Sequence, residues 1–167
     1  MVNLIDSPGH VDFSIEVSSA VSLSDGALIM IDVIEGVSPQ TTTVIKQAWE
    51  ARVKTCLVLN KLDRLIVDKW YDAKECYNWI TQIIETANSY VSGLIQGEHL
   101  KKQEEASKRD RRLSSNNSSG SEKMTDAELE AAELEYLYSP EKGNVAFASA
   151  LDNWAFTLDT LCPRIAK

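Results

Sequence analysis

The chain has 167 residues, of which 44% are apolar and 25% are charged, a composition that fits one folded domain and excludes wholesale disorder. Its 25 acidic and 17 basic residues give a net charge of −8, which excludes a broad basic face for gripping RNA. The three cysteines show no C-x-x-C spacing, which argues against a disulfide framework or a zinc site, and no apolar run reaches membrane-spanning length. We therefore expect one domain of a cytoplasmic protein that makes no contact with a membrane.

The first predicted elements are a buried strand at residues 2–6, a turn, and a helix over about residues 11–21. A strand that turns into a helix sets backbone N–H groups beside polar side chains, and α/β folds bind phosphates and their metal at such corners. In this turn Asp6 can hold Mg²⁺ through its water shell, Gly9 lets its N–H reach a phosphate oxygen, and His10 can orient a water for attack. The alternative is an ordinary corner with a surface histidine.

The next elements continue the alternation of strand and helix. The apolar run 27–33 predicts a parallel strand covered on both faces, and Ser38 followed by Pro39 predicts the start of a helix that continues to about Arg52. Residues 54–59 predict the following strand. Because strands and helices alternate without hairpin signals, the fold class we expect is α/β, with a parallel doubly wound sheet.

The strand at 54–59 leads into Asn60-Lys61-Leu62-Asp63, a loop whose residue types suit a guanine base. Guanine presents adjacent N1–H and N2–H₂ donors, and a single carboxylate such as Asp63 accepts both, whereas adenine lacks this donor pair. Lys61 can lay its aliphatic stem over the base, and Asn60 can join neighbouring loops. The alternative is a common polar loop after a strand.

The rest of the chain predicts a long helix from about Asp72 to Leu94, a strand at 144–148 and a last helix over about 154–162. Glu75 follows Asp72 at the spacing of a capping pair. The apolar stripe of the long helix consists of Tyr77, Ile80, Ile84, Ala87 and Val91. We interpret the aromatic residues near its start as packing residues rather than a base-stacking surface (Trp70, Tyr71 and Trp79).

Residues 97–137 differ in composition from the rest of the chain. Residues 101–112 are rich in both charges, residues 114–121 read SSNNSSGS, and residues 125–136 are acidic and alanine-rich with the pattern of a short helix. We expect a flexible, charged, low-complexity insert within a single domain of residues 1–167.

Together the motifs resemble the GTP-binding domain of translational GTPases. Asp6–Gly9 is similar to the third guanine-nucleotide motif of that family, with His10 in the place of its water-positioning histidine. Asn60–Asp63 is similar to the fourth motif, and Ser149-Ala150-Leu151 is similar to the fifth, in which the N–H at the Ala150 position bonds guanine O6. The resemblance implies a P-loop GTPase-like fold that binds GTP or GDP with Mg²⁺.

Within that family, residues 3–16 (NLIDSPGHVDFSIE) resemble the elongation factor 2 branch. Residues 47–49, 60–67 and 139–145 are most similar to its elongation factor-like GTPase 1 group, which matures the large ribosomal subunit. The resemblance implies a monomer that hydrolyses GTP on the ribosome and contacts the large subunit and its RNA mostly through other domains. Three alternatives stay open: translocation of the elongation factor 2 type, a nucleotide-independent docking module, and a scaffold that acts through the insert.

The resemblance also implies parts that this sequence does not contain. A phosphate loop of the form G-x-x-x-x-G-K-[ST] is expected before the strand that ends at Asp6, yet none of the seven glycines precedes a lysine. The N-terminal strand and the first switch of the family are expected there as well. Because the phosphate loop contacts the most highly charged part of the nucleotide, we expect a partial domain that neither binds GTP tightly nor hydrolyses it alone.

Overall fold

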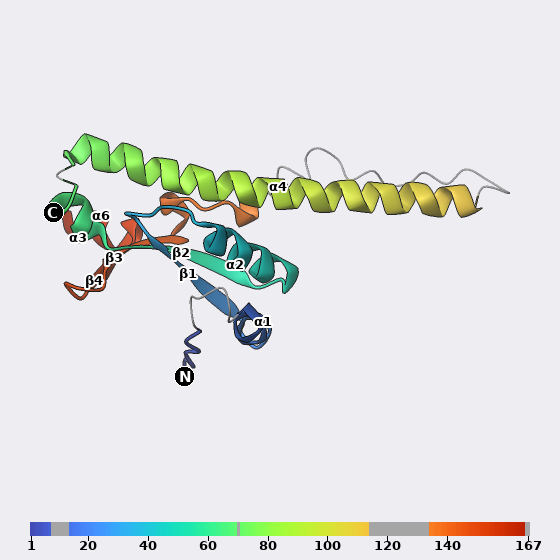
Figure 1. The fold of residues 1–167 in the computed structure, drawn as a ribbon, viewed down its shortest axis with the longest axis horizontal. Coiled ribbons are helices and arrows are strands. Elements are labelled where there is room, and N and C mark those ends of the chain that lie inside the picture. Colours follow the sequence, from blue (N-terminus) through green and yellow to red (C-terminus); the bar gives the residue numbers. More distant parts are fainter. Residues whose placement is uncertain (8–13, 70, 114–133, 166–167) are drawn as a thin grey trace. The chain divides into compact units, whose positions relative to one another are not determined.

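The computed structural model describes residues 1–7, 14–69, 71–113 and 134–165. The chain forms two compact units, one of residues 1–88 with 138–167 and one of residues 89–137. The first unit holds the sheet (Figure 1). The elements, in chain order, are α1 (Ser14–Ser22), β1 (Gly26–Asp32), α2 (Pro39–Glu50), β2 (Lys54–Asn60), α3 (Leu62–Val67), α4 (Ala73–Leu113), the 3₁₀ helix η2 (Pro140–Lys142), β3 (Val145–Ser149), β4 (Trp154–Phe156) and α6 (Leu158–Ile165).

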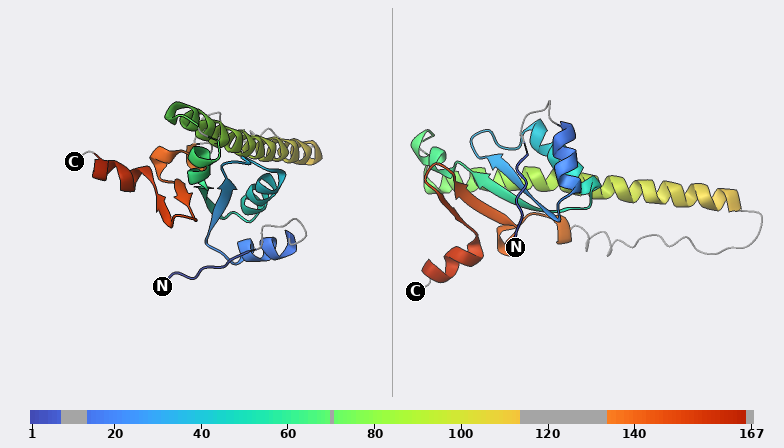
Figure 2. Two further views of the ribbon diagram at one scale, coloured as in Figure 1. Left: turned by 60° about the vertical axis from the view of Figure 1, so that its left-hand side comes forward. Right: turned by 90° about the horizontal axis from the view of Figure 1, so that it is seen from below.

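The four described strands form one sheet in the order β1-β2-β3-β4 (Figure 2). β1 pairs with β2, and β2 with β3, in parallel, so the predicted α/β class and its parallel core are confirmed. β4 runs antiparallel to β3, so the predictions of a helix start at Trp154 and of no hairpin are wrong. The reason is local, because Asn153 adopts a left-handed φ of 56° in the connecting turn and Phe156 stacks on Phe147 with ring centroids 5.4 Å apart.

Residues 2–6 do not form the buried strand that their apolar composition predicts. Residues 1–7 form neither helix nor strand, and their side chains are exposed. A strand needs a neighbour that satisfies its backbone N–H and C=O groups, and no strand of the described sheet pairs with this segment. Apolar composition does not supply such a partner, which is why the prediction fails.

Strand β1 buries only one of its faces. Ile29 and Ile31 are 3% and 1% exposed, whereas Leu28 and Met30 are 63% and 54% exposed. Alternate side chains of a strand point to opposite faces, and α2 packs against β1 and β2. The prediction that this strand is covered on both faces is therefore wrong for the described residues.

The two longer helices begin as the sequence predicts. Ser38 caps α2, because its Oγ accepts the Thr41 N–H at 3.2 Å, and Pro39 occupies the first helical position. At the start of α4 the Glu75 carboxylate accepts the Asp72 N–H at 3.0 Å. Both contacts satisfy N–H groups that lack a partner within the helix, so each stabilises the helix start.

The predicted apolar stripe of α4 is partly wrong. Tyr77, which it includes, is exposed, and Ile83, which it omits, is buried. The Trp79 indole N–H donates to the Val33 carbonyl at 2.6 Å, which confirms a packing role for this tryptophan. Trp70 lies outside the described residues.

Helix α4 ends at Leu113 and not near Leu94. Glu98 and Lys102 form an ion pair at 2.9 Å one helical turn apart, and the residues that follow are mostly strong helix formers. Residues 101–112 of the predicted flexible insert are therefore helical, while residues 114–133 lie outside the described residues.

Replacing Gly143 with alanine is expected to destabilise the first unit by about 1–2 kcal/mol, measured by urea unfolding. Gly143 has a φ of +73°, and an added Cβ would lie 2.8 Å from Asp159 Oδ2. Gly93→Ala is the control, because a Cβ there meets open space within α4 and should be neutral or stabilising. Equal effects of the two substitutions would contradict a special conformation at Gly143.

Candidate functional site

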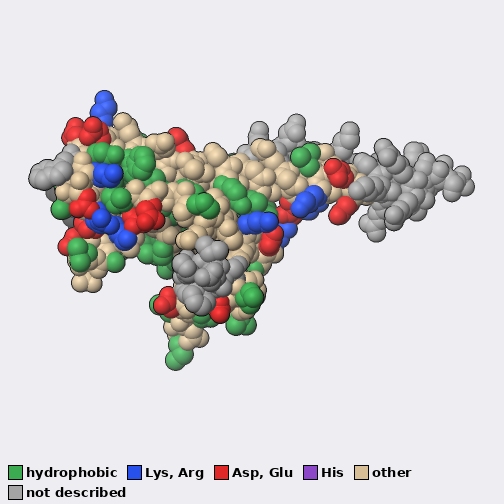
Figure 3. Space-filling view, in the orientation of Figure 1, with side chains coloured by type: hydrophobic (Ala, Val, Ile, Leu, Met, Phe, Trp, Pro, Cys, Tyr) green, Lys and Arg blue, Asp and Glu red, His purple; other side chains and the backbone are tan. Residues whose placement is uncertain are grey.

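The polar ends of β1, β2 and β3 lie at one edge of the sheet, since parallel strands end on the same side. Asp32, the last residue of β1, stands opposite Asn60, the last residue of β2. Ser149 ends β3. In Figure 3, acidic and basic side chains lie side by side over the left-hand part of the molecule, where Figure 1 places α3. This edge carries mixed charge rather than a field of one sign.

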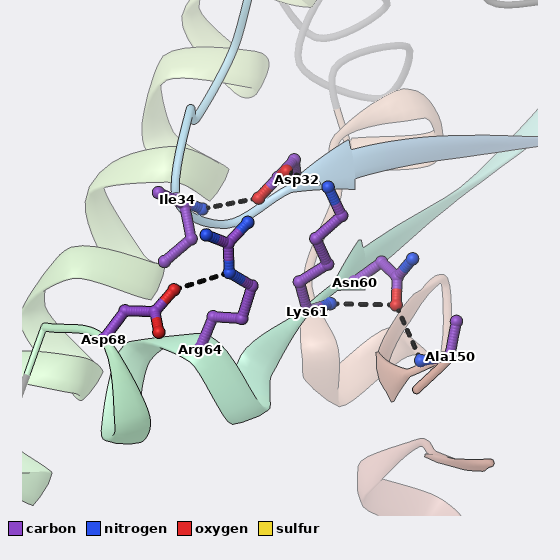
Figure 4. A network of polar contacts seen from close by, with 7 residues as sticks. All are labelled: Asp32, Ile34, Asn60, Lys61, Arg64, Asp68 and Ala150. Atoms are coloured by element: carbon purple, nitrogen blue, oxygen red, sulfur yellow. Dashed lines mark hydrogen bonds and ion pairs between the residues drawn. The ribbon is translucent and has the colours of Figure 1, made fainter. Parts of the chain in front are cut away.

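Asn60 joins the loops that follow β2 and β3. Its Oδ1 accepts the Lys61 N–H at 2.8 Å and the Ala150 N–H at 3.0 Å (Figure 4). The Ala150 N–H, to which the resemblance assigns guanine O6, therefore donates to Asn60 in this structure. The structure brings Asn60, Lys61 and Ala150 together as one hydrogen-bonded group.

Ser149 holds the loop after β3 from within. Its side chain is fully buried, its Oγ donates to Asp152 Oδ2 at 3.3 Å, and the same Oγ accepts the Asp152 N–H at 3.2 Å. Ala150 and Leu151, the next two residues, are exposed. Ser149 therefore orders the loop, while its two neighbours are available to a ligand.

Asp63 carries a polar atom with no partner. Its Oδ1 is buried and forms no hydrogen bond with the residues that the structure describes. A buried carboxylate oxygen without a donor is costly, so such atoms in native proteins point to a missing partner. A ligand that presents two adjacent N–H donors, as guanine does, would satisfy this oxygen.

Lys61 is held at both ends. Its backbone adopts a left-handed φ of 65°, unusual for a residue with a side chain, and its Nζ forms an ion pair with Asp32 Oδ2 at 2.5 Å. Burial raises the pKa of Asp32, but the hydrogen bond from Lys61, the Ile34 N–H and the charges of Lys61 and Arg64 outweigh burial and hold the pKa below its usual 3.8. Sequence patterns predict no role for Asp32, whose one signal is that it is a carboxylate at the end of an apolar strand.

The Asp32–Lys61 pair predicts a pH-dependent stability. Because the pKa of Asp32 is lower in the folded than in the unfolded chain, its contribution is fully present above about pH 5 and is lost as the pH falls through 4 and below. Urea unfolding should show Asp32→Asn less stable than wild type near pH 6, with the difference shrinking near pH 3.

The control for this prediction is Glu50→Gln, which removes the partner of Lys46 in an exposed pair at 3.9 Å. An exposed pair contributes little, so this variant should track the wild type at both pH values. A difference between wild type and Asp32→Asn that does not change with pH would contradict the prediction.

Of the first predicted motif, residues 6–10, the structure describes only Asp6 and Ser7. Asp6 is exposed and makes no hydrogen bond or ion pair with the described part of the chain, while Gly9 and His10 lie outside it. No group of three or more His, Cys, Asp or Glu among the described residues could hold a metal ion. Nor does any described helix combine the length and apolar character that a membrane span requires.

A mainly parallel sheet with polar loops gathered at the carboxyl ends of its strands is the architecture of an α/β nucleotide-binding domain, here of the P-loop GTPase type. Residues 1–166 match the family described as the elongation factor Tu GTP binding domain, and the chain belongs to that family. The predicted resemblance to translational GTPases is thus confirmed.

Among known proteins, the chain is 44% identical over 163 residues to human "Elongation factor-like GTPase 1", an alignment that covers 95% of this chain and 14% of that protein. It is 42% identical over 159 residues to "Ribosome assembly protein 1" of Schizosaccharomyces pombe, again covering 95% of this chain and 14% of that protein. The namesake in Saccharomyces cerevisiae is 40% identical over 162 residues, which is 96% of this chain and 14% of the yeast protein. The chain therefore spans about one seventh of the length of these relatives.

Proposed function

We propose that this chain is the guanine-reading part of the GTP-binding domain of a GTPase that acts in late maturation of the large (60S) ribosomal subunit. Membership of the GTP-binding family supports a guanine nucleotide as the ligand. The names of the similar human and yeast proteins support ribosome maturation as the process. The observation that carries the proposal is the buried, unpartnered Oδ1 of Asp63 beside the joined loops after β2 and β3.

In this proposal the residues divide the work of reading guanine. Asp63 accepts the N1–H and N2–H₂ groups, and the Lys61 stem covers the plane of the base. Ser149 orders its loop so that Ala150 and Leu151 line the base, with the Ala150 N–H exchanging its Asn60 acceptor for guanine O6. Asn60 then keeps the Lys61 N–H and continues to hold the loop after β2.

The proposed roles of the first motif concern the phosphate end. Asp6 would hold Mg²⁺ through water, Gly9 would donate its N–H to a phosphate oxygen, and His10 would orient the attacking water. When bound, Mg²⁺ would neutralise charge on the phosphates. Catalysis would then depend on positioning, which a ribosome can supply to His10, so the factor alone should be slow.

The proposed setting is the cytoplasm, with the large ribosomal subunit and its RNA as partners and with a monomeric factor. The net charge of −8 favours RNA contact through other parts of the protein rather than through this domain. The 97–137 insert is proposed to be an appendage of the domain that nucleotide binding does not need.

A chimera tests the proposal. The 162 residues of Saccharomyces cerevisiae "Ribosome assembly protein 1" that match this chain would be replaced by it, in yeast lacking the native protein. We expect large subunits to be restored in sucrose gradients, and a chimera with Asp63→Ala to fail although it accumulates to the same level. A stable chimera that leaves the subunits unrestored, or an Asp63→Ala chimera that restores them fully, would contradict the proposal.

A further inference from the structure

The carboxylate of Asp32 is a rigid group that faces the predicted guanine site from a neighbouring strand. Its Oδ1 accepts the Ile34 N–H at 2.9 Å, and the Asp32 carbonyl accepts the Gly36 N–H at 2.8 Å, which closes the turn after β1. The Trp79 side chain bonds the Val33 carbonyl in the same turn. The side chain of Asp32 is only 17% exposed. The carboxylate is thus fixed by the turn independently of Lys61.

Lys61 reaches this carboxylate across the ends of two strands. Its backbone N–H is held by Asn60 Oδ1 at 2.8 Å, and its Nζ is held by Asp32 Oδ2 (Figure 4). A free lysine side chain samples many rotamers, so fixing both ends costs entropy that the ion pair must offset. The four methylene groups of the Lys61 stem therefore have a defined direction at the ends of the strands.

A second cation nearby does not compete for this carboxylate. Arg64 donates from its Nε to Asp68 at 2.6 Å, one turn along α3. Asp68 thus occupies Arg64 and leaves Oδ2 of Asp32 to Lys61 (Figure 4). Lys61 therefore forms the ion pair with Asp32, and Arg64 acts on this carboxylate through its charge.

We infer that Asp32 is a positioning residue for guanine recognition, which acts by holding the Lys61 stem as one wall of the slot for the base. This inference rests on the proposed function, because that function gives Lys61 the role of covering the base. Asp32 itself touches no nucleotide in this account. Because the Lys61 stem is already ordered, the site loses little conformational entropy there when the nucleotide binds. Loss of Asp32 therefore weakens the binding of guanine nucleotides, and it does so through Lys61 alone.

A double-mutant cycle on nucleotide affinity tests the inference. GDP and ADP would be titrated into the 167-residue chain by NMR, for wild type, Asp32→Asn, Lys61→Met and the double variant. Asn keeps an acceptor for the Ile34 N–H, and Met keeps an apolar stem without the charge. We expect Asp32→Asn to weaken GDP binding about five- to ten-fold in the wild-type background and to have no further effect in the Lys61→Met background.

Glu50→Gln is the matched control, because it removes an exposed carboxylate of α2 that pairs with Lys46 and not with Lys61, and it should leave GDP affinity unchanged. NMR relaxation of the Lys61 side-chain carbons, measured without nucleotide, gives an independent test. The mobility of this side chain should be higher in Asp32→Asn than in the wild type. If Asp32→Asn does not fold, Asp32→Glu replaces it, because glutamate keeps the charge but is longer by one methylene group. This variant should lower GDP affinity in the wild-type background and have no effect in the Lys61→Met background.

The outcomes separate the inference from the proposed function. A wild-type chain that binds ADP as well as GDP would overturn the proposed function. A wild-type chain that prefers GDP, with Asp32→Asn weakening binding equally in both Lys61 backgrounds or not at all, would overturn the positioning role alone.

Discussion

The Asp63→Asn variant should bind guanine nucleotides more weakly and xanthine nucleotides more tightly than the wild type. Guanine offers two donors to Asp63, whereas xanthine offers the N1–H donor and a C2 carbonyl that a carboxylate repels. An asparagine amide accepts the first and donates to the second. Two hydrogen bonds to a charged group contribute about 3–6 kcal/mol, so the GDP-to-XDP affinity ratio should fall by roughly 100-fold or more.

The exchange is nearly isosteric and should leave the fold intact. Asp63 Oδ1 forms no hydrogen bond with the described residues, so replacing the carboxylate breaks no hydrogen bond of that oxygen. The unfolding midpoint should match or exceed that of the wild type, because an amide is cheaper to bury than a charge. Titrations with GDP, XDP and ADP check the ratio, and an unchanged ratio with native stability would show that Asp63 does not read the base.

Leu57→Ala should have the largest effect on stability. Leu57 is fully buried in the centre of the sheet, between Ile29 of β1 and Val145 of β3. Truncating such a leucine removes buried apolar area and leaves a cavity, at a cost of about 2–5 kcal/mol. Urea unfolding at constant pH measures the loss.

Leu28→Ala is the matched control on the neighbouring strand. Leu28 is 63% exposed, so its truncation should cost well under about 1 kcal/mol. A similar loss for both variants would indicate that the exposed face of β1 is covered in solution, and it would contradict the one-sided burial described above.

The features that the sequence predicts well are those with a local signal. Ser38-Pro39 marks the start of α2 and Asp72 with Glu75 the start of α4, because capping involves residues within one turn. The apolar runs that become β1, β2 and β3 are likewise evident from composition. Asn60 and Ala150 come together as the motifs imply, although they are 90 residues apart.

The features that escape prediction depend on distant partners. Residues 2–6 have the composition of a strand, but no described strand pairs with them. Trp154–Phe156 becomes a strand because β3 offers it an edge. The Asp32–Lys61 pair spans 29 residues and follows from the register of β1 on β2, which the sequence alone does not reveal. Each of these outcomes depends on which strands are adjacent.

The central claim is that the loops after β2 and β3 together read a guanine base. Residue-resolved NMR of the chain titrated with GDP, and separately with ADP, tests it most directly. We predict that the amide signals of residues 60–63 and 149–151 shift together with GDP, with one common dissociation constant, and stay in place with ADP. Shifts of equal size with both nucleotides, or shifts with GDP confined to other residues, would contradict the claim.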